Sequence, residues 1–161
     1  MFKTRFALKK WSRFRFWKKK IAWGKFINNG QICVSPDYLL VKESIKDNFV
    51  IELKQQVKAF YTKEASKSES YSRIVNNKHF DRLVNHLEDA KKHNATFVMG
   101  GKSKSEDNFI EPTVISNLPE NASLLQDEIF GPILPIKTYK TNEEVINYIN
   151  SKEKPLALYI Y

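Results

Sequence analysis

The chain has 161 residues, which suits about one domain at the usual ~100–200 residues per domain. Its 11 Phe, 7 Tyr and 3 Trp supply the apolar surface that disordered chains lack, and its single cysteine excludes a disulfide framework. No apolar run approaches the ~18 residues of a membrane span. The formal net charge of +9 is the one unusual value, so its distribution decides what it means.

All of the excess positive charge lies in residues 1–20, which contain nine Lys or Arg and no acidic residue, so the remaining 18 basic residues balance the 18 acidic ones. Six Phe or Trp side chains interleave with these cations, a mixture that suits a nucleic acid or an anionic membrane surface. Neither a helical period nor strict alternation runs through the segment, however. We therefore expect residues 1–20 to be a basic, aromatic leader of irregular structure, with nucleic-acid or membrane binding as the less favoured alternative.

The globular part begins with residues 21–26, a compact apolar helical segment. Asn28, Asn29 and Gly30 then predict a turn, because these residue types tolerate positive φ. Residues 35–37 predict a second turn and residues 38–41 a short strand.

Two amphipathic helices are predicted in the middle of the chain. The first begins near Ser44 and repeats apolar residues at three- and four-residue steps, at Val50, Leu53, Val57 and Phe60. A polar loop over residues 62–70 separates it from the second helix, over residues 77–93. Residues 96–99 then predict a strand that ends at two glycines.

The last third predicts extended structure over residues 109–115 and strands over residues 133–139 and 156–161. Two prolines in or beside the 133–139 strand suggest an edge strand or an entry segment. Thr141 and Glu144 form a capping-box pattern that opens a helix between the last two strands. Strands that alternate with helices predict an α/β domain, with a mainly parallel sheet and flanking helices.

Cys33 is the first candidate for chemistry. A thiol is only a few per cent ionised at neutral pH, yet it is intrinsically nucleophilic. The neighbouring Gly30 would let a substrate carbonyl approach backbone N–H groups that hold an oxyanion. The alternative is a small buried core residue, which is the commoner situation for cysteine.

The three histidines at positions 79, 86 and 93 are spaced by seven residues. On a helix this places them on one side but about 10 Å apart along the axis, too far to share one metal ion. We predict three surface residues and no metal site.

The segment from Asp127 to Pro132 is the second candidate. A carboxylate next to an aromatic residue and a Gly-Pro turn could accept hydrogen bonds from ribose hydroxyls, while the ring packs on a flat heterocycle. The alternative is a plain turn between a helix and a strand. The sequence contains no G-x-G-x-x-G motif and no phosphate-binding loop, so it has no direct nucleotide fingerprint.

Residues 21–38, Ile-Ala-Trp-Gly-Lys-Phe-Ile-Asn-Asn-Gly-Gln-Ile-Cys-Val-Ser-Pro-Asp-Tyr, closely resemble the catalytic-cysteine segment of aldehyde dehydrogenases. The Ala-Trp-Gly-Lys and Pro-Asp-Tyr flanks are most similar to the class 3, fatty-aldehyde-type branch. Glu-Pro-Thr-Val at 111–114 and Asp-Glu-Ile-Phe-Gly-Pro at 127–132 match two further family motifs in the expected order. Residues 21–161 therefore resemble part of the catalytic domain of that family.

The resemblance implies that a small-molecule aldehyde is oxidised to a carboxylic acid with NAD or NADP. Cys33 would attack the aldehyde to form a thiohemiacetal, and loss of hydride would leave a thioester that water hydrolyses. The backbone N–H of Cys33 would be one oxyanion donor, Glu128 would bind the nicotinamide ribose, and Phe130 would line the nicotinamide pocket. The resemblance also implies a homo-oligomer, and we expect a cytoplasmic location.

The family pattern also predicts what this chain lacks. In the family a Rossmann-like cofactor domain, an oxyanion-hole Asn and a general-base Glu precede the cysteine segment, and residues 1–20 match none of them. The family also continues past residue 161. We therefore expect a fragment that oxidises little or no aldehyde alone. The alternatives are a catalytically dead domain whose basic arm binds nucleic acid or anionic membrane, and a cofactor-free thiol esterase that uses Cys33.

Overall fold

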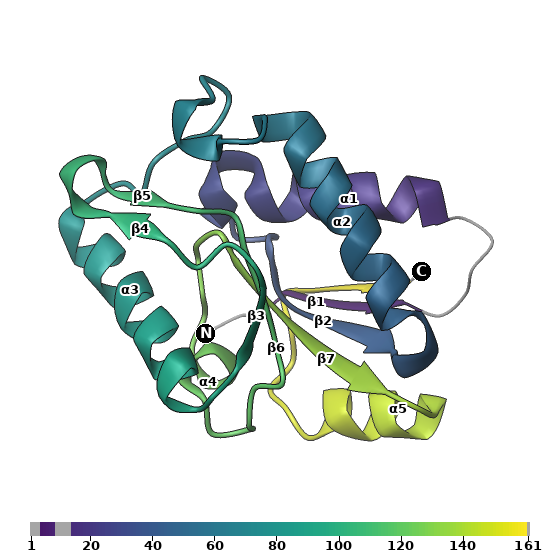
Figure 1. The fold of residues 1–161 in the computed structure, drawn as a ribbon. Coiled ribbons are helices and arrows are strands. Elements are labelled where there is room, and N and C mark those ends of the chain that lie inside the picture. The colour runs from purple at the N-terminus through teal and green to yellow at the C-terminus, as the bar shows by residue number, and fades with distance from the viewer. Residues whose placement is uncertain (1–3, 9–13, 161) are drawn as a thin grey trace.

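The computed structural model describes residues 4–8 and 14–160, with side chains from residue 17 onward. A six-stranded sheet in the order β3-β6-β7-β2-β1-β8 forms its centre. Its strands in chain order are β1 Thr4–Leu8, β2 Pro36–Lys42, β3 Thr96–Met99, β6 Thr113–Ser116, β7 Ile133–Tyr139 and β8 Ala157–Ile160. The helices are α1 Phe14–Phe26, α2 Lys46–Tyr61, α3 Asn77–Lys92, α4 Ser123–Gln126 and α5 Asn142–Asn150, and a small hairpin is made by β4 Ser103–Lys104 and β5 Phe109–Ile110 (Figure 1).

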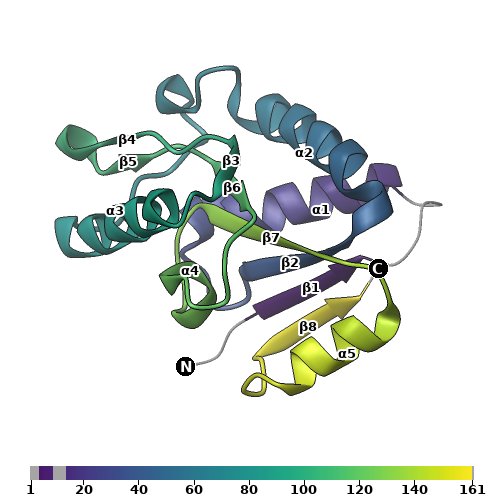
Figure 2. The ribbon, with the colours of Figure 1, turned by 60° about the horizontal axis from the view of Figure 1, so that its bottom comes forward.

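Four of the five strand pairs in the main sheet are parallel, and only β3 runs antiparallel to its neighbour β6. Helices α1 and α2 lie on one face of this sheet and α5 lies on the other (Figure 2). The predicted class, an α/β domain with a mainly parallel sheet, is therefore confirmed. No helix among the described residues combines the length and apolar character needed to cross a bilayer.

Strand β2 shows how one strand serves both layers. Leu39 and Val41 pack in the cluster under α1 and α2, whereas Tyr38 and Leu40 belong to the cluster that meets α5. Successive side chains of a strand point to opposite faces, so a strand buried on both sides reads as a continuous apolar run. This explains why residues 38–41 show no polar alternation.

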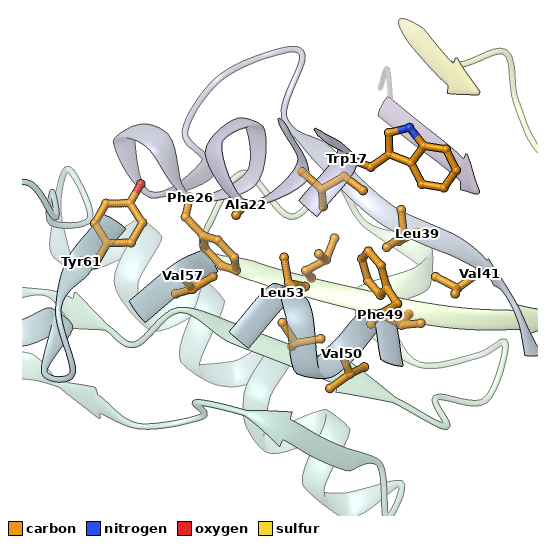
Figure 3. Packing of buried hydrophobic residues seen from close by; sticks show 14 of the residues in the cluster. Trp17, Ala22, Phe26, Leu39, Val41, Phe49, Val50, Leu53, Val57 and Tyr61 are labelled. Carbon is orange, nitrogen blue, oxygen red and sulfur yellow. The ribbon is translucent and has the colours of Figure 1, made fainter. Parts of the chain in front are cut away.

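The cluster under α1 and α2 is the larger core, and it begins within the predicted leader. Trp17 is 6% exposed and packs with the buried face of α2, which includes Phe49, Leu53 and Val57 (Figure 3). Burying one such side chain stabilises the fold by about 1.5–3 kcal/mol. These contacts join α1 to α2 above the centre of the sheet.

Side-chain caps mark the starts of α3 and α5. Asn76 accepts a hydrogen bond from the His79 backbone N–H at 2.9 Å, and α3 begins at the next residue. Thr141 does the same for Glu144 at the start of α5, at 3.3 Å. Such caps satisfy backbone donors that the first helical turn leaves without partners. The predicted cap at Thr141 is thus confirmed.

Two predictions about strands are wrong. Strand β7 is interior, between β6 and β2, despite its prolines. Pro135 is tolerated because it pairs only with Ile115 of β6, and the register with β2 starts one residue later, at Ile136. Pro36 and Asp37, predicted as part of a turn, are instead the first residues of β2.

The described part of the predicted leader is regular rather than irregular. Residues 4–8 form β1 between β2 and β8, and α1 starts at Phe14 and runs across the boundary predicted after residue 20. Lys18 also forms an ion pair with Glu52 of α2. Residues 1–3 and 9–13, which carry part of the predicted basic arm, lie outside the described residues.

Candidate active site

Cys33 lies in the turn between α1 and β2, and its side chain is exposed. The alternative of a buried core cysteine is therefore wrong. The three residues of the predicted turn, Asn28, Asn29 and Gly30, all have positive φ, at 48°, 54° and 68°. This left-handed path reverses the chain at the end of α1 and carries Cys33 to the surface.

Side-chain amides attach this turn to a neighbouring segment. Gln31 donates to the Arg73 carbonyl at 3.1 Å and accepts from the Val75 backbone N–H at 3.0 Å. Asn29, which is fully buried, donates to the Ser72 carbonyl at 2.7 Å. The turn that carries Cys33 is thereby fixed to the segment that leads into α3.

Two buried charged residues, Lys25 and Asp37, lie beneath the turn. Lys25 is 1% exposed, and its Nζ donates to the Pro36 carbonyl at 2.7 Å. Burial lowers the pKa of Lys25 to about 8, and the nearby Asp37 opposes this shift. Asp37 is 4% exposed and accepts a hydrogen bond from the Ile129 backbone N–H at 2.9 Å. This buried pair therefore also contacts the second candidate segment.

The two candidate segments are in direct contact. A Cβ added at Gly30 would overlap the carbonyl oxygen of Gly131 and would come within 2.9 Å of the Lys25 carbonyl oxygen. Only a glycine fits this approach, and its φ of 68° independently favours glycine. The turn before Cys33 and the loop that follows Glu128 and Phe130 therefore lie side by side.

Glu128 and Phe130 are both half-buried, and they flank Ile129, which has no exposed surface. Phe130 has a φ of 46°, a conformation that costs about 1 kcal/mol or more for a residue with a side chain. Such a residue persists only where its neighbours fix the backbone. Here the buried Ile129 side chain and the hydrogen bond from the Ile129 backbone N–H to Asp37 do so on one side.

Arg82, on α3, holds the same backbone from the other side. Its guanidinium donates to the Glu128 carbonyl at 3.0 Å and to the Ile129 carbonyl at 2.7 Å. Burial lowers the pKa of Arg82, and the carboxylates of Asp127, Glu128 and Asp37 oppose this shift. Sequence analysis missed Arg82, because nothing in the helical pattern distinguishes it from a solvated arginine.

The prediction of three surface histidines is wrong for one of them. His79 is exposed and His93 is intermediate, but His86 is only 5% exposed. His86 lies between Arg82, at 3.3 Å, and Ser123 of α4, at 2.8 Å. Within residues 4–8 and 14–160, no group of three His, Cys, Asp or Glu side chains is arranged to hold a metal ion.

Comparison with known sequences identifies relatives of this chain. The model of the aldehyde dehydrogenase family matches residues 17–161. The chain is 42% identical over 143 residues to "Aldehyde dehydrogenase, dimeric NADP-preferring" of Bos taurus, covering 89% of this chain and 58% of the relative. It is 43% identical over 143 residues to the "4,4'-diaponeurosporen-aldehyde dehydrogenase" of Staphylococcus aureus, covering 89% of this chain and 30% of that protein.

Comparison with solved structures finds the same fold in aldehyde dehydrogenases. A substrate-bound Staphylococcus aureus AldH superposes with a TM-score of 0.93 at 38% identity, covering 99% of this chain and 34% of that one. An indole-3-acetaldehyde dehydrogenase in complex with NAD+ has the same fold at a TM-score of 0.81 and 18% identity, covering 98% of this chain and 37% of that one. The chain thus spans about a third of the length of these solved structures.

Proposed function

The chain belongs to the aldehyde dehydrogenase family, an oxidoreductase family, and from this premise we propose that it carries the nucleophile side of an aldehyde-oxidising site. Cys33 is the nucleophile in this proposal. Glu128 and Phe130 form part of the nicotinamide site. In this proposal the remaining parts of the reaction come from family regions outside the third of the solved relatives' length that this chain spans.

One observation carries the proposal: the turn of Cys33 packs directly on the loop of Glu128 and Phe130, through Gly30 and Gly131. The thiol is exposed, as a group that must meet a substrate needs to be. The two half-buried side chains flank a buried Ile129, so a carboxylate and a ring border one short loop. A carboxylate suits ribose hydroxyls and a ring suits a flat heterocycle, which fits a nicotinamide nucleoside.

In the proposed reaction the Cys33 sulfur bonds to the aldehyde carbon, and the carbonyl oxygen takes up a proton to give a thiohemiacetal. The backbone N–H of Cys33 donates to that oxygen while it carries negative charge. When bound, NAD+ or NADP+ would supply the acceptor for the hydride that leaves the former aldehyde carbon, while the thiohemiacetal hydroxyl loses its proton to water. Water then attacks the resulting thioester, which releases the carboxylic acid and restores the thiol.

The cofactor and the assembly are proposed from the relatives. Four mammalian relatives are named dimeric and NADP-preferring, and two solved structures are described as complexes with NAD+. We propose that this chain serves the same nicotinamide chemistry within a homo-oligomer. The alternative of a binding module acting through residues 1–20 has no support from the part of the chain that is described.

The nucleophile is tested on the 161-residue chain itself with p-nitrophenyl acetate. We expect a burst of p-nitrophenol close to one equivalent and acetylation of Cys33 in the mass spectrum. Turnover after the burst is expected to be slow, because a positioned general base typically gives ~10²–10⁴-fold and the family's base lies outside this region. Release of p-nitrophenol at the same rate by Cys33→Ala would contradict the proposal.

The oxidation itself is tested in a chimera, in which residues 17–161 of this chain replace the aligned segment of the Staphylococcus aureus relative. A folded chimera is expected to reduce NAD+ or NADP+ with an aldehyde and to lose this activity with Cys33→Ala. A chimera that has the melting temperature of the parent enzyme and binds cofactor, yet is inactive, would refute the assignment. The isolated chain is expected to produce little or no NADH or NADPH.

A further inference from the structure

We infer that Arg82 is a positioning residue for the loop of Glu128 and Phe130, and that a neutral His86 holds the Arg82 guanidinium in place. The inference rests on the proposed function only where it assigns Glu128 and Phe130 to the cofactor. The geometry of the loop is independent of that assignment.

The peptide unit around Ile129 is held from two directions. Arg82 donates to the carbonyls of Glu128 and Ile129 at 3.0 and 2.7 Å, and the Ile129 N–H donates to Asp37 at 2.9 Å. The Arg82 contacts come from α3 and the Asp37 contact from β2. Because Phe130 adopts a φ of 46°, these contacts hold a backbone conformation that a phenylalanine does not favour by itself.

The contacts of His86 define its protonation. Arg82 has only N–H donors, so the His86 Nε2 at 3.3 Å acts as an acceptor and carries no proton. Nδ1 therefore carries the proton and donates to Ser123 Oγ at 2.8 Å. Ser123 Oγ in turn donates to Asp89 Oδ2 at 2.9 Å. Arg82, which also donates to the Ile129 carbonyl, is thus the first donor in a series of hydrogen bonds that runs through His86 and Ser123 to Asp89.

The hydrogen bonds among His86, Ser123 and Asp89 do not form a hydrolase triad. In that arrangement the histidine stands between the serine and the carboxylate and removes the serine proton. Here Ser123 stands between His86 and Asp89 and donates its own proton to the carboxylate, and its backbone N–H also donates to Asp89, at 2.9 Å. The arrangement orients groups and does not activate a nucleophile.

Protonation of His86 would place a second positive charge against Arg82. Imidazoles in general gain this proton at mildly acidic pH. Four carboxylates lie near His86 and Arg82: Asp89 on α3, and Asp127, Glu128 and Asp37 around the loop. The same surface hollow is also lined by Lys78, His79 and Asp81. Asp89 attracts the extra proton, but a protonated Nε2 can no longer accept from Arg82, so the Arg82 contact is lost.

The first test is hydrogen exchange of the 161-residue chain, with the Ile129 amide as the reporter. Arg82→Met removes both donors while keeping most of the length of the side chain. We expect the protection of that amide to fall about tenfold or more. Lys91→Met, which removes an exposed cation paired with Glu88 on the same helix, is the matched control and should change nothing there. Unchanged protection in Arg82→Met would overturn the inference.

The second test is a pH profile, which a merely structural arginine would not produce. The wild-type chain should lose Ile129 protection as the pH falls and His86 becomes protonated. In His86→Gln an amide oxygen accepts from Arg82 and cannot titrate, so protection should persist at acid pH. Arg82→Lys should restore part of the protection lost in Arg82→Met. A profile that is the same in wild type and His86→Gln would refute the role of His86.

Acetylation of Cys33 by p-nitrophenyl acetate, measured in the same variants, separates this inference from the proposed function. If the wild-type chain is not acetylated at Cys33, the proposed nucleophile fails while the exchange result stands. If acetylation is normal but exchange is insensitive to residue 82, the inference fails alone.

Discussion

Because Lys25 is buried, we expect the free energy of unfolding of this chain to rise with pH in the alkaline range. The side chain is 1% exposed, and its pKa is lowered from 10.5 to about 8 because burial disfavours the ammonium ion. Between these two values the unfolded chain binds more protons than the folded one. The free energy of unfolding must therefore rise as the pH increases from about 8 to 10.5. This gain in stability is lost as the pH falls back through about 8.

The size of this effect follows from the same two values. The difference between 10.5 and about 8 corresponds to about 3 kcal/mol, at about 1.4 kcal/mol per unit. From about pH 7.5 to about pH 9.5 the rise is about 2 kcal/mol. The measurement should stop there, because burial raises the pKa values of Tyr61, Tyr71 and Tyr139 above 10.0 and their ionisation in the unfolded chain opposes the rise.

The assay is urea unfolding followed by tryptophan fluorescence at several pH values. Lys25→Met removes the titrating group, so the rise of about 2 kcal/mol should disappear. The lost hydrogen bond to Pro36 lowers stability equally at every pH and does not change the slope. Lys92→Met, at an exposed position on α3, should keep the rise. Parallel profiles for wild type and Lys25→Met would show that the buried ammonium has no such role.

Two pairs of backbone and capping changes give further expectations. Gly30→Ala should cost about 1–3 kcal/mol, because of its positive φ and its contact with the neighbouring loop, and it should slow acetylation of Cys33. Gly24→Ala is the matched control: its Cβ would meet nothing within 4 Å inside α1, so it should stabilise the chain by about 0.5–1 kcal/mol in the same urea assay. Thr141→Ala removes the cap of α5 and should cost about 1 kcal/mol, whereas Thr141→Ser should keep most of it, and equal losses in both variants would argue against capping.

The elements that sequence analysis predicted well are those whose own side chains decide the structure. Helix α2 repeats buried residues at the helical period, and the observed bounds of β3 and β7 coincide with the predicted ranges 96–99 and 133–139. The turn at residues 28–30 was predicted from residue types alone, and all three have positive φ. In each case the information is local, because periodicity and turn chemistry act within a few residues.

The errors concern contacts between distant parts of the chain. The interior position of β7 depends on β2 and β6, which no pattern within residues 133–139 encodes. His86 is buried because Arg82 and Ser123 satisfy its ring nitrogens, and Arg82 reaches a carbonyl 46 residues away. A polar side chain on a helix looks the same in sequence whether it is solvated or satisfied internally.

The glycine before Cys33 shows how such distant contacts build the site. Sequence analysis explained Gly30 by a substrate carbonyl that approaches the backbone. In the structure the carbonyl that approaches Gly30 is that of Gly131, and the hydrogen bond from Ile129 to Asp37 spans 92 residues at the same junction. Each of the two motifs therefore provides a packing surface for the other, in addition to the chemistry proposed for it. A change that keeps Cys33 and Glu128 but adds a side chain at Gly30 should separate the two groups, so the glycine contributes to the arrangement of the proposed site although it supplies no reacting group.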